Sequence, residues 1–222
     1  MLKTPKYRHW YPIFFVMIRT GMRVGECTGL RWDDVDLENN SIDINHTLVY
    51  YSKGKKDGCM YAINSPKTSK SRRLIPISDE VKEAFLDELN YQREVGIESK
   101  AVVDGYRDFV FVNRFGQCMN NGILNKALAR IIRDANDEAL YEDDGEQILL
   151  PHFSCHNLRH SFATRMCEAG LNMKFIQDIL GHADITTTMN IYADCTDRIK
   201  LDAMGKLEDY YNKGGNLYEE FK

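Results

Sequence analysis

The chain has 222 residues, of which 43% are apolar and 28% are charged, and its formal net charge is −4. This length suits one well-packed domain, and this composition excludes a disordered chain. The longest apolar run, residues 10–18, contains Pro12 and is too short to cross a bilayer, so we expect no membrane partner. Six scattered cysteines and the lack of a secretion signal at the start predict reduced thiols and a cytoplasmic location.

The charge is distributed unevenly along the sequence. Residues 134–147 carry seven acidic side chains and neither Lys nor Arg, so the remainder of the chain is net positive. Residues 67–73 carry four basic side chains and no acid: Lys67, Lys70, Arg72 and Arg73. This asymmetry is compatible with a local basic face for a nucleic acid, although a charge run is more often a solvated surface.

The first half predicts two helices followed by strands. A buried helix over Tyr11–Arg19 is broken by Gly21, and a second short helix follows over Val24–Leu30. Alternating β-branched residues then predict a strand over residues 41–50, and further strands are expected over residues 60–63 and 73–77. We expect residues 66–71 to form the hairpin loop between the last two strands, within one small antiparallel sheet.

The second half predicts mainly helices. Ser78 can cap a helix whose apolar residues follow helical spacing. Further helices are expected over residues 121–139, 156–169, 173–180, 186–192 and 197–211, with an acidic loop over residues 141–147. The predicted fold class is therefore mainly α with a small antiparallel β-sheet (α+β), in a single domain over residues 1–222.

The last third carries a set of side chains that suits chemistry on a phosphodiester. His156 and Arg159 are three residues apart on a predicted helix, so they project from one face. Arginine can fork onto phosphate oxygens, and histidine can donate hydrogen bonds or move protons at neutral pH. Taken alone, this pair does not indicate a site, because such side chains also occur incidentally on the exposed face of a helix. We expect the nearby His160 to be a buried residue of the same helix.

Longer motifs give the pair its meaning. Residues 156–164 read His-Asn-Leu-Arg-His-Ser-Phe-Ala-Thr, residues 180–182 read Leu-Gly-His, and Tyr192 follows ten residues after His182. Near the start, residues 20–35 supply a second arginine, Arg23, within Thr-Gly-Met-Arg-Val-Gly-Glu. Over roughly residues 11–195, these stretches resemble the tyrosine recombinases, the family of phage and conjugative-element integrases. The resemblance implies their DNA breaking-rejoining catalytic fold.

The resemblance also implies a role for each matching residue. Two arginines would hold the phosphate, two histidines would stabilise its charge, a lysine would protonate the leaving oxygen and a tyrosine would attack phosphorus: Arg23, Arg159, His156, His182, Lys67 and Tyr192. Three further basic residues would contact the DNA backbone: Lys70, Arg72 and Arg73. We expect no metal and no other cofactor, because the cations are side chains.

The implied activity is that of a site-specific recombinase catalytic domain. It would cleave and rejoin DNA strands through a covalent 3′-phosphotyrosine intermediate, in the integration or excision of a mobile element. Its partners would be double-stranded DNA, other recombinase protomers in a DNA-bound tetramer, and accessory DNA-bending or directionality proteins. We expect a C-terminal fragment of a longer integrase, with the N-terminal DNA-binding domains absent.

Three other interpretations stay open. The chain could be a catalytically inactive DNA-binding accessory protein on the same scaffold, or a monomeric enzyme that relaxes DNA as type IB topoisomerases do. A metal-dependent nuclease is more distant: His152, His156 and His160 have the spacing of helical zinc ligands, but the Glu of an H-E-x-x-H motif is missing. Cys155 is better read as a structural cysteine than as a nucleophile.

Overall fold

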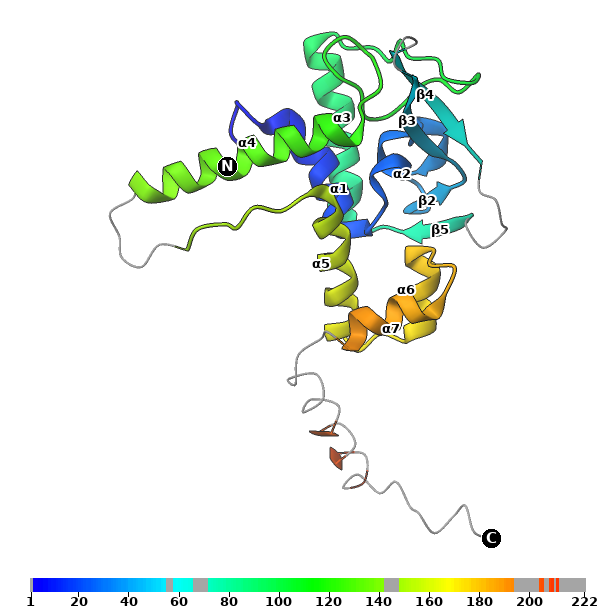
Figure 1. Cartoon of the computed structure of the whole chain (residues 1–222), viewed down its shortest axis with the longest axis vertical. Coiled ribbons are helices and arrows are strands. Elements are labelled where there is room, and N and C mark those ends of the chain that lie inside the picture. Colours follow the sequence, from blue (N-terminus) through cyan, green and yellow to red (C-terminus); the bar gives the residue numbers. More distant parts are fainter. Residues whose placement is uncertain are drawn as a thin grey trace.

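The structure is a computed structural model. It describes residues 2–54, 58–65, 72–141, 148–193, 204–205, 208–209 and 211. A helix-rich body carries two small antiparallel sheets on one side (Figure 1). This arrangement confirms the predicted α+β class. Within the described residues, no helix is both long enough and apolar enough to span a membrane.

The helices lie close to the positions that the sequence predicts. They are α1 (Tyr11–Thr20), α2 (Val24–Thr28), α3 (Asp79–Val95), α4 (Asn121–Tyr141), α5 (Cys155–Glu168), α6 (Met173–Leu180) and α7 (Ile185–Ala193). Two 3-10 turns accompany them, η1 (Arg8–Trp10) and η2 (Trp32–Asp34). Tyr141, the first residue of the expected acidic loop, is the last residue of α4. Residues 142–147 of that loop and most of the expected helix over residues 197–211 lie outside the described residues.

The strands form two sheets, whereas the sequence predicted one. They are β1 (Val35–Asp36), β2 (Ser41–Ile44), β3 (Thr47–Gly54), β4 (Gly58–Asn64) and β5 (Arg73–Pro76). The first sheet has the order β1-β2-β5, and β3 pairs only with β4 in the second. The predicted hairpin between the fourth and fifth strands is therefore wrong, because β5 pairs with β2.

Side-chain hydrogen bonds explain why the predicted strand over residues 41–50 is divided. The ring of His46 is buried, and its Nε2 lies 2.6 Å from the carbonyl oxygen of Gly29. The amide of Asn45 donates to Asp34 Oδ1 over 2.8 Å. These bonds hold residues 45 and 46 against the segment around α2 and η2, so the chain leaves one sheet before it enters the other.

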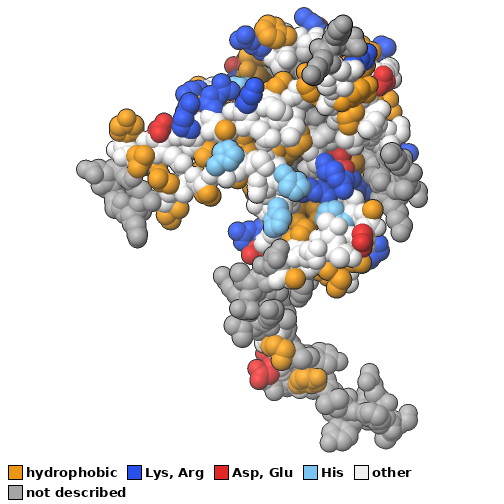
Figure 2. Space-filling view, in the orientation of Figure 1, with side chains coloured by type: hydrophobic (Ala, Val, Ile, Leu, Met, Phe, Trp, Pro, Cys, Tyr) orange, Lys and Arg blue, Asp and Glu red, His pale blue; other side chains and the backbone are white. Residues whose placement is uncertain are grey.

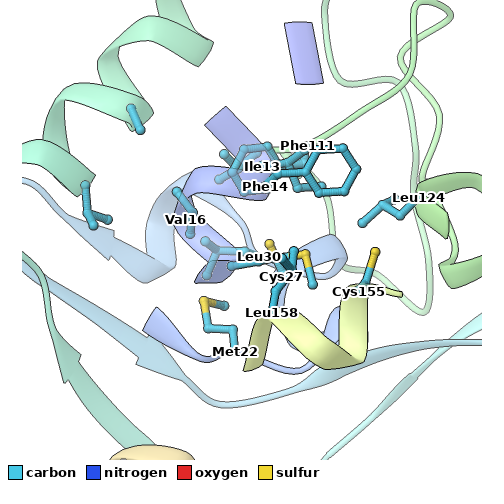
Figure 3. Packing of buried hydrophobic residues seen from close by; sticks show 14 of the residues in the cluster. Ile13, Phe14, Val16, Met22, Cys27, Leu30, Phe111, Leu124, Cys155 and Leu158 are labelled. Atoms are coloured by element: carbon cyan, nitrogen blue, oxygen red, sulfur yellow. The ribbon is translucent and has the colours of Figure 1, made fainter. Parts of the chain in front are cut away.

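Helix α1 forms the centre of the main hydrophobic core. Its residues Ile13, Val16 and Met17 are at most 1% exposed. In Figure 3, Ile13 and Phe14 of α1 lie beside Phe111 of the segment before α4, and Leu158 of α5 lies beside Cys27 of α2 in the same core. Each fully buried aliphatic side chain of this kind stabilises the fold by about 1.5–3 kcal/mol. This packing fixes α5 against α1 and thereby brings the last third of the chain to the N-terminal helices.

A second, smaller core joins α5, α6 and α7. It includes Ala163, Ile176 and Leu180, each at most 1% exposed. Helix α1 ends against this cluster at Gly21, whose φ of 64° is left-handed. A methyl group at Gly21 would overlap the ring of Phe162 and lie 3.0 Å from Leu180 Cδ2. The chain therefore turns from α1 into α2 in close contact with α5 and α6.

We expect Gly21→Ala to destabilise the protein by more than the backbone strain alone. The left-handed φ costs about 1 kcal/mol for a residue with a Cβ, and overpacking adds about 1–3 kcal/mol. Gly105→Ala is the matched control, because Gly105 also has a positive φ, of 84°, but no atom lies within 4 Å of an added Cβ. Urea unfolding of both variants measures the difference, and equal losses of stability would contradict the close contact.

Candidate active site

Three arginines converge on the C-terminus of α6. The last carbonyl groups of a helix have no partner inside it and carry a partial negative charge. Three consecutive carbonyl oxygens there each accept a hydrogen bond from a different arginine: Ile179 from Arg73 Nε at 2.6 Å, Leu180 from Arg159 Nη2 at 2.6 Å, and Gly181 from Arg23 Nη2 at 2.8 Å. The end of α6 therefore gathers side chains from β5, from α5 and from the residue before α2.

A buried carboxylate, Glu26 of α2, ties two of these arginines together. Arg73 forks onto it, with Nη1 donating to Oε1 at 3.0 Å and Nη2 to Oε2 at 2.8 Å. Arg23 Nη1 also donates to Oε1, at 2.7 Å. Burial raises the pKa of Glu26, but the hydrogen bonds and charges of Arg73 and Arg23 outweigh burial and hold that pKa below its ordinary value. We call the three arginines and Glu26 the arginine cluster. It contains three guanidinium groups and one carboxylate, so it carries excess positive charge.

Arg159 donates to two carbonyl oxygens and forms no ion pair with a carboxylate among the described residues. Its side chain is buried, and Nη1 donates to the carbonyl of Gly21 over 2.6 Å. Burial, followed by the charge of Arg23, lowers the pKa of Arg159 to about 9. The guanidinium is thus still protonated at neutral pH, but at a cost in desolvation and repulsion. A bound anion would offset both costs.

His182 directly follows the turn that ends α6. Its Nδ1 lies 3.0 Å from Oγ1 of Thr188 in α7. Partial burial, followed by the charges of Arg159, Arg23 and Arg73, lowers the pKa of His182 to about 4. The imidazole is therefore neutral at pH 7, with a single N–H. It can serve as a hydrogen-bond donor to an oxygen, but it adds no positive charge to the cluster.

His156 lies on α5 three residues before Arg159, as predicted. Its side chain is exposed and makes no hydrogen bond within the described part of the chain. The expected burial of His160 is wrong, because α5 turns Leu158 and Ala163 inward and leaves residue 160 in solvent. Figure 2 shows histidine side chains beside a group of Lys and Arg side chains, in the angle between α4 and the helices α5–α7.

The expected DNA-contacting residues divide into two kinds. Arg72 is exposed and paired with Asp43, with Nη2 and Oδ2 2.7 Å apart. The side chain of Arg73 is only 6% exposed. Its guanidinium is occupied by Glu26 and the end of α6, and this burial argues against the expected phosphate contact. Arg73 instead links Glu26 to the C-terminus of α6.

Three of the predicted residues lie wholly or partly outside the described part of the chain. Lys67 and Lys70 lie outside the described residues. The backbone of Tyr192 belongs to α7, but its side chain is also outside the description. Their predicted roles stay predictions.

The motifs imply a different role for Arg73 and do not single out Thr188. The inward direction of Arg73 could have been predicted, because a strand turns alternate residues to one face and Ile75 and Ile77 are both buried. That alternation puts Arg73 on the inner face of β5. No sequence pattern marks Thr188 out from the neighbouring threonines, since its contact with His182 depends on how α7 packs on α6.

The sequence matches a family of known proteins. Residues 2–198 match the model of the phage integrase family. The chain belongs to the phage integrase family. This membership confirms the resemblance that the motifs indicated.

Several family members are similar over most of this integrase-family chain. It is 33% identical to the transposase from transposon Tn916 of Enterococcus faecalis over 190 residues, which are 86% of this chain and 43% of that protein. A tyrosine recombinase XerC-like protein of Caldanaerobacter subterraneus is 27% identical, over 90% of this chain and 49% of its own length. Among solved structures, the Tn1549 transposon integrase in complex with transposon right-end DNA matches with a TM-score of 0.77 at 30% identity. That match covers 93% of this chain and 61% of the other.

We expect Glu26→Gln to cost about 3 kcal/mol at pH 7, because removing one partner leaves buried charge unpaired. The depressed pKa of Glu26 means that its stabilisation is complete above its unfolded-state pKa near 4.5 and is lost as the pH falls through the lower folded-state value. The stability difference between wild type and variant should therefore shrink below about pH 4.5.

Urea unfolding at a series of pH values measures this difference, and Glu38→Gln, at an exposed position, is the control. A difference that stayed constant down to pH 2 would contradict the role of the Glu26 carboxylate.

Proposed function

We propose that this chain is the catalytic domain of a site-specific DNA recombinase, an integrase that breaks and rejoins strands through a covalent phosphotyrosine. One observation carries the proposal: Arg23 and Arg159, more than a hundred residues apart, donate to adjacent carbonyls at the end of α6. Each uses only part of its five N–H groups in doing so, and the remaining N–H groups suit the oxygens of one phosphate. Because the matching region is 43% of the Tn916 transposase, the domain would act within a longer protein.

The proposed reaction gives each residue of the motifs one role. The Tyr192 hydroxyl loses its proton to water as its oxygen attacks phosphorus. The bond from phosphorus to the 5′-oxygen breaks, and that oxygen takes a proton from Lys67, which regains one from water. Arg23 and Arg159 offset the negative charge that builds on the non-bridging oxygens, while His182 and His156 donate hydrogen bonds to them. The 5′-hydroxyl of another strand then attacks the phosphotyrosine, releases Tyr192 and forms a new phosphodiester bond.

The partners of this reaction follow from the same chemistry. Strand exchange needs two duplexes and a tyrosine for each cleaved strand, which is the task of a DNA-bound tetramer of recombinase protomers. Accessory DNA-bending or directionality proteins would set the direction towards integration or excision. Arg72, together with Lys67 and Lys70, would contact the DNA backbone. The reaction would take place in the cytoplasm, with the DNA.

We expect the protein to form a covalent adduct with a nicked suicide duplex, whose cleaved end diffuses away and traps the intermediate. The adduct should survive denaturation, persist in EDTA and be absent in Tyr192→Phe, because phenylalanine has no oxygen to attack phosphorus. Tyr141→Phe is the matched control, since Tyr141 is 89% exposed at the end of α4.

Gel electrophoresis of labelled DNA detects the adduct. DNA binding by wild type without an adduct on any substrate would support the inactive accessory protein instead. An adduct that formed in Tyr192→Phe would show a different nucleophile.

We expect Arg159→Lys to slow adduct formation by about 100-fold or more, because a point-charge ammonium cannot replace a planar guanidinium that holds two carbonyls and a phosphate. Arg165→Lys is the matched control on the same helix, since the Arg165 side chain is 78% exposed and pairs only with Glu168 among the described residues. Single-turnover kinetics at saturating DNA measure the rate. A similar rate for the two variants would remove Arg159 from the phosphate site.

A further inference from the structure

The hydrogen bond that His182 is proposed to donate depends on which nitrogen of its ring carries the proton. A neutral imidazole has one N–H and one lone pair, and the hydrogen bond at one nitrogen decides which nitrogen carries the proton. His182 is neutral at pH 7 because burial and three nearby guanidinium groups oppose its charge. To donate to a phosphate oxygen through Nε2, the ring must carry its proton there, and a hydrogen bond accepted at Nδ1 favours that tautomer.

Thr188 supplies the group that meets this requirement. Its side chain is fully buried, with 0% exposure, and Oγ1 lies 3.0 Å from Nδ1 of His182. No other hydrogen bond joins the Thr188 hydroxyl to a described residue. A hydroxyl can donate as well as accept, and a buried hydroxyl without a partner costs about 1–3 kcal/mol. The hydroxyl and the imidazole therefore depend on each other.

The backbone of His182 is held as firmly as its ring. The Gln177 side chain donates through Nε2 to the carbonyl of His182 over 3.1 Å, and the His182 N–H donates to the carbonyl of Gln177 over 3.1 Å. These bonds fix the backbone of His182, whereas the tautomer of its ring depends on the ring's own hydrogen bond. Thr188 is the partner in that bond within the described residues. Nε2 has no partner there, which leaves it for a ligand.

We infer that Thr188 is a positioning residue: its hydroxyl donates to Nδ1 of His182 and thereby selects the tautomer that presents Nε2–H to a phosphate oxygen. Thr188 lies four residues before Tyr192 in α7, about one helical turn along the chain. The same hydrogen bond therefore ties the helix that carries the proposed nucleophile to the end of α6. This inference rests on the proposed function for its purpose, but the tautomer exists whether or not DNA is cleaved.

The test compares Thr188→Val, which keeps the branched shape and removes the hydroxyl, with Thr188→Ser, which keeps the hydroxyl. Nitrogen-15 NMR of histidine-labelled protein without DNA reports the tautomer directly, with the His182 signal assigned from its loss in His182→Gln. We expect wild type and Thr188→Ser to show protonated Nε2, and Thr188→Val to show a mixture of tautomers. Thr187→Val is the matched control, because Thr187 is exposed on the same helix.

A second readout follows adduct formation on the nicked duplex. We expect Thr188→Val to be slowed about tenfold at saturating DNA, the rate equivalent of one neutral hydrogen bond, with unchanged DNA affinity. Wild-type protein with the proton on Nδ1 would overturn the inference even if every variant failed to fold, and so would an unchanged His182 spectrum in Thr188→Val. Absence of any adduct in wild type, with the expected tautomer present, would count against the proposed function alone.

Discussion

The C-terminus of α6 is the constraint on which the site depends. Its three last carbonyl groups would be left without partners by the helix, and three guanidinium groups satisfy them one by one. Like charges repel, so arginines gather in this way only where negative partners hold them. The partial charge of the helix end and the carboxylate of Glu26 provide that hold.

This constraint explains why the site favours an anion. Positive charge that is partly buried and only partly neutralised favours an anion, because the low local dielectric strengthens the attraction. The charges of Arg159, Arg23 and Arg73 also help to keep His182 neutral, so the site combines three guanidinium groups with a hydrogen-bond donor that carries no charge. Since the guanidinium groups are fixed before any ligand arrives, binding a phosphate requires little rearrangement. Such preorganisation is what stabilisation of a pentavalent phosphorus transition state requires.

Much of the fold could be predicted from the sequence, because breakers and apolar spacing act locally. Gly21 and Gly181 mark where α1 and α6 end, and both have left-handed backbones. The division of the strands at Asn45 could not be predicted, since it depends on hydrogen bonds to residues that are distant in sequence. For the site, the motifs gave Arg23, Arg159 and His182, which the structure brings together.

The inward direction of Arg73 follows from strand alternation, but its partner Glu26 depends on how β5 packs against α2. The roles of Lys67 and Tyr192 stay predictions from the motifs alone, because Lys67 and the Tyr192 side chain lie outside the described residues.

The most direct test of the central claim is a crystal structure of the Tyr192→Phe protein bound to a DNA duplex that the wild type cleaves. The account predicts that the scissile phosphate lies within hydrogen-bond distance of Arg23 and Arg159 while both still donate to the carbonyls at the end of α6. A phosphate bound elsewhere, or arginines that leave those carbonyls to reach it, would contradict the account.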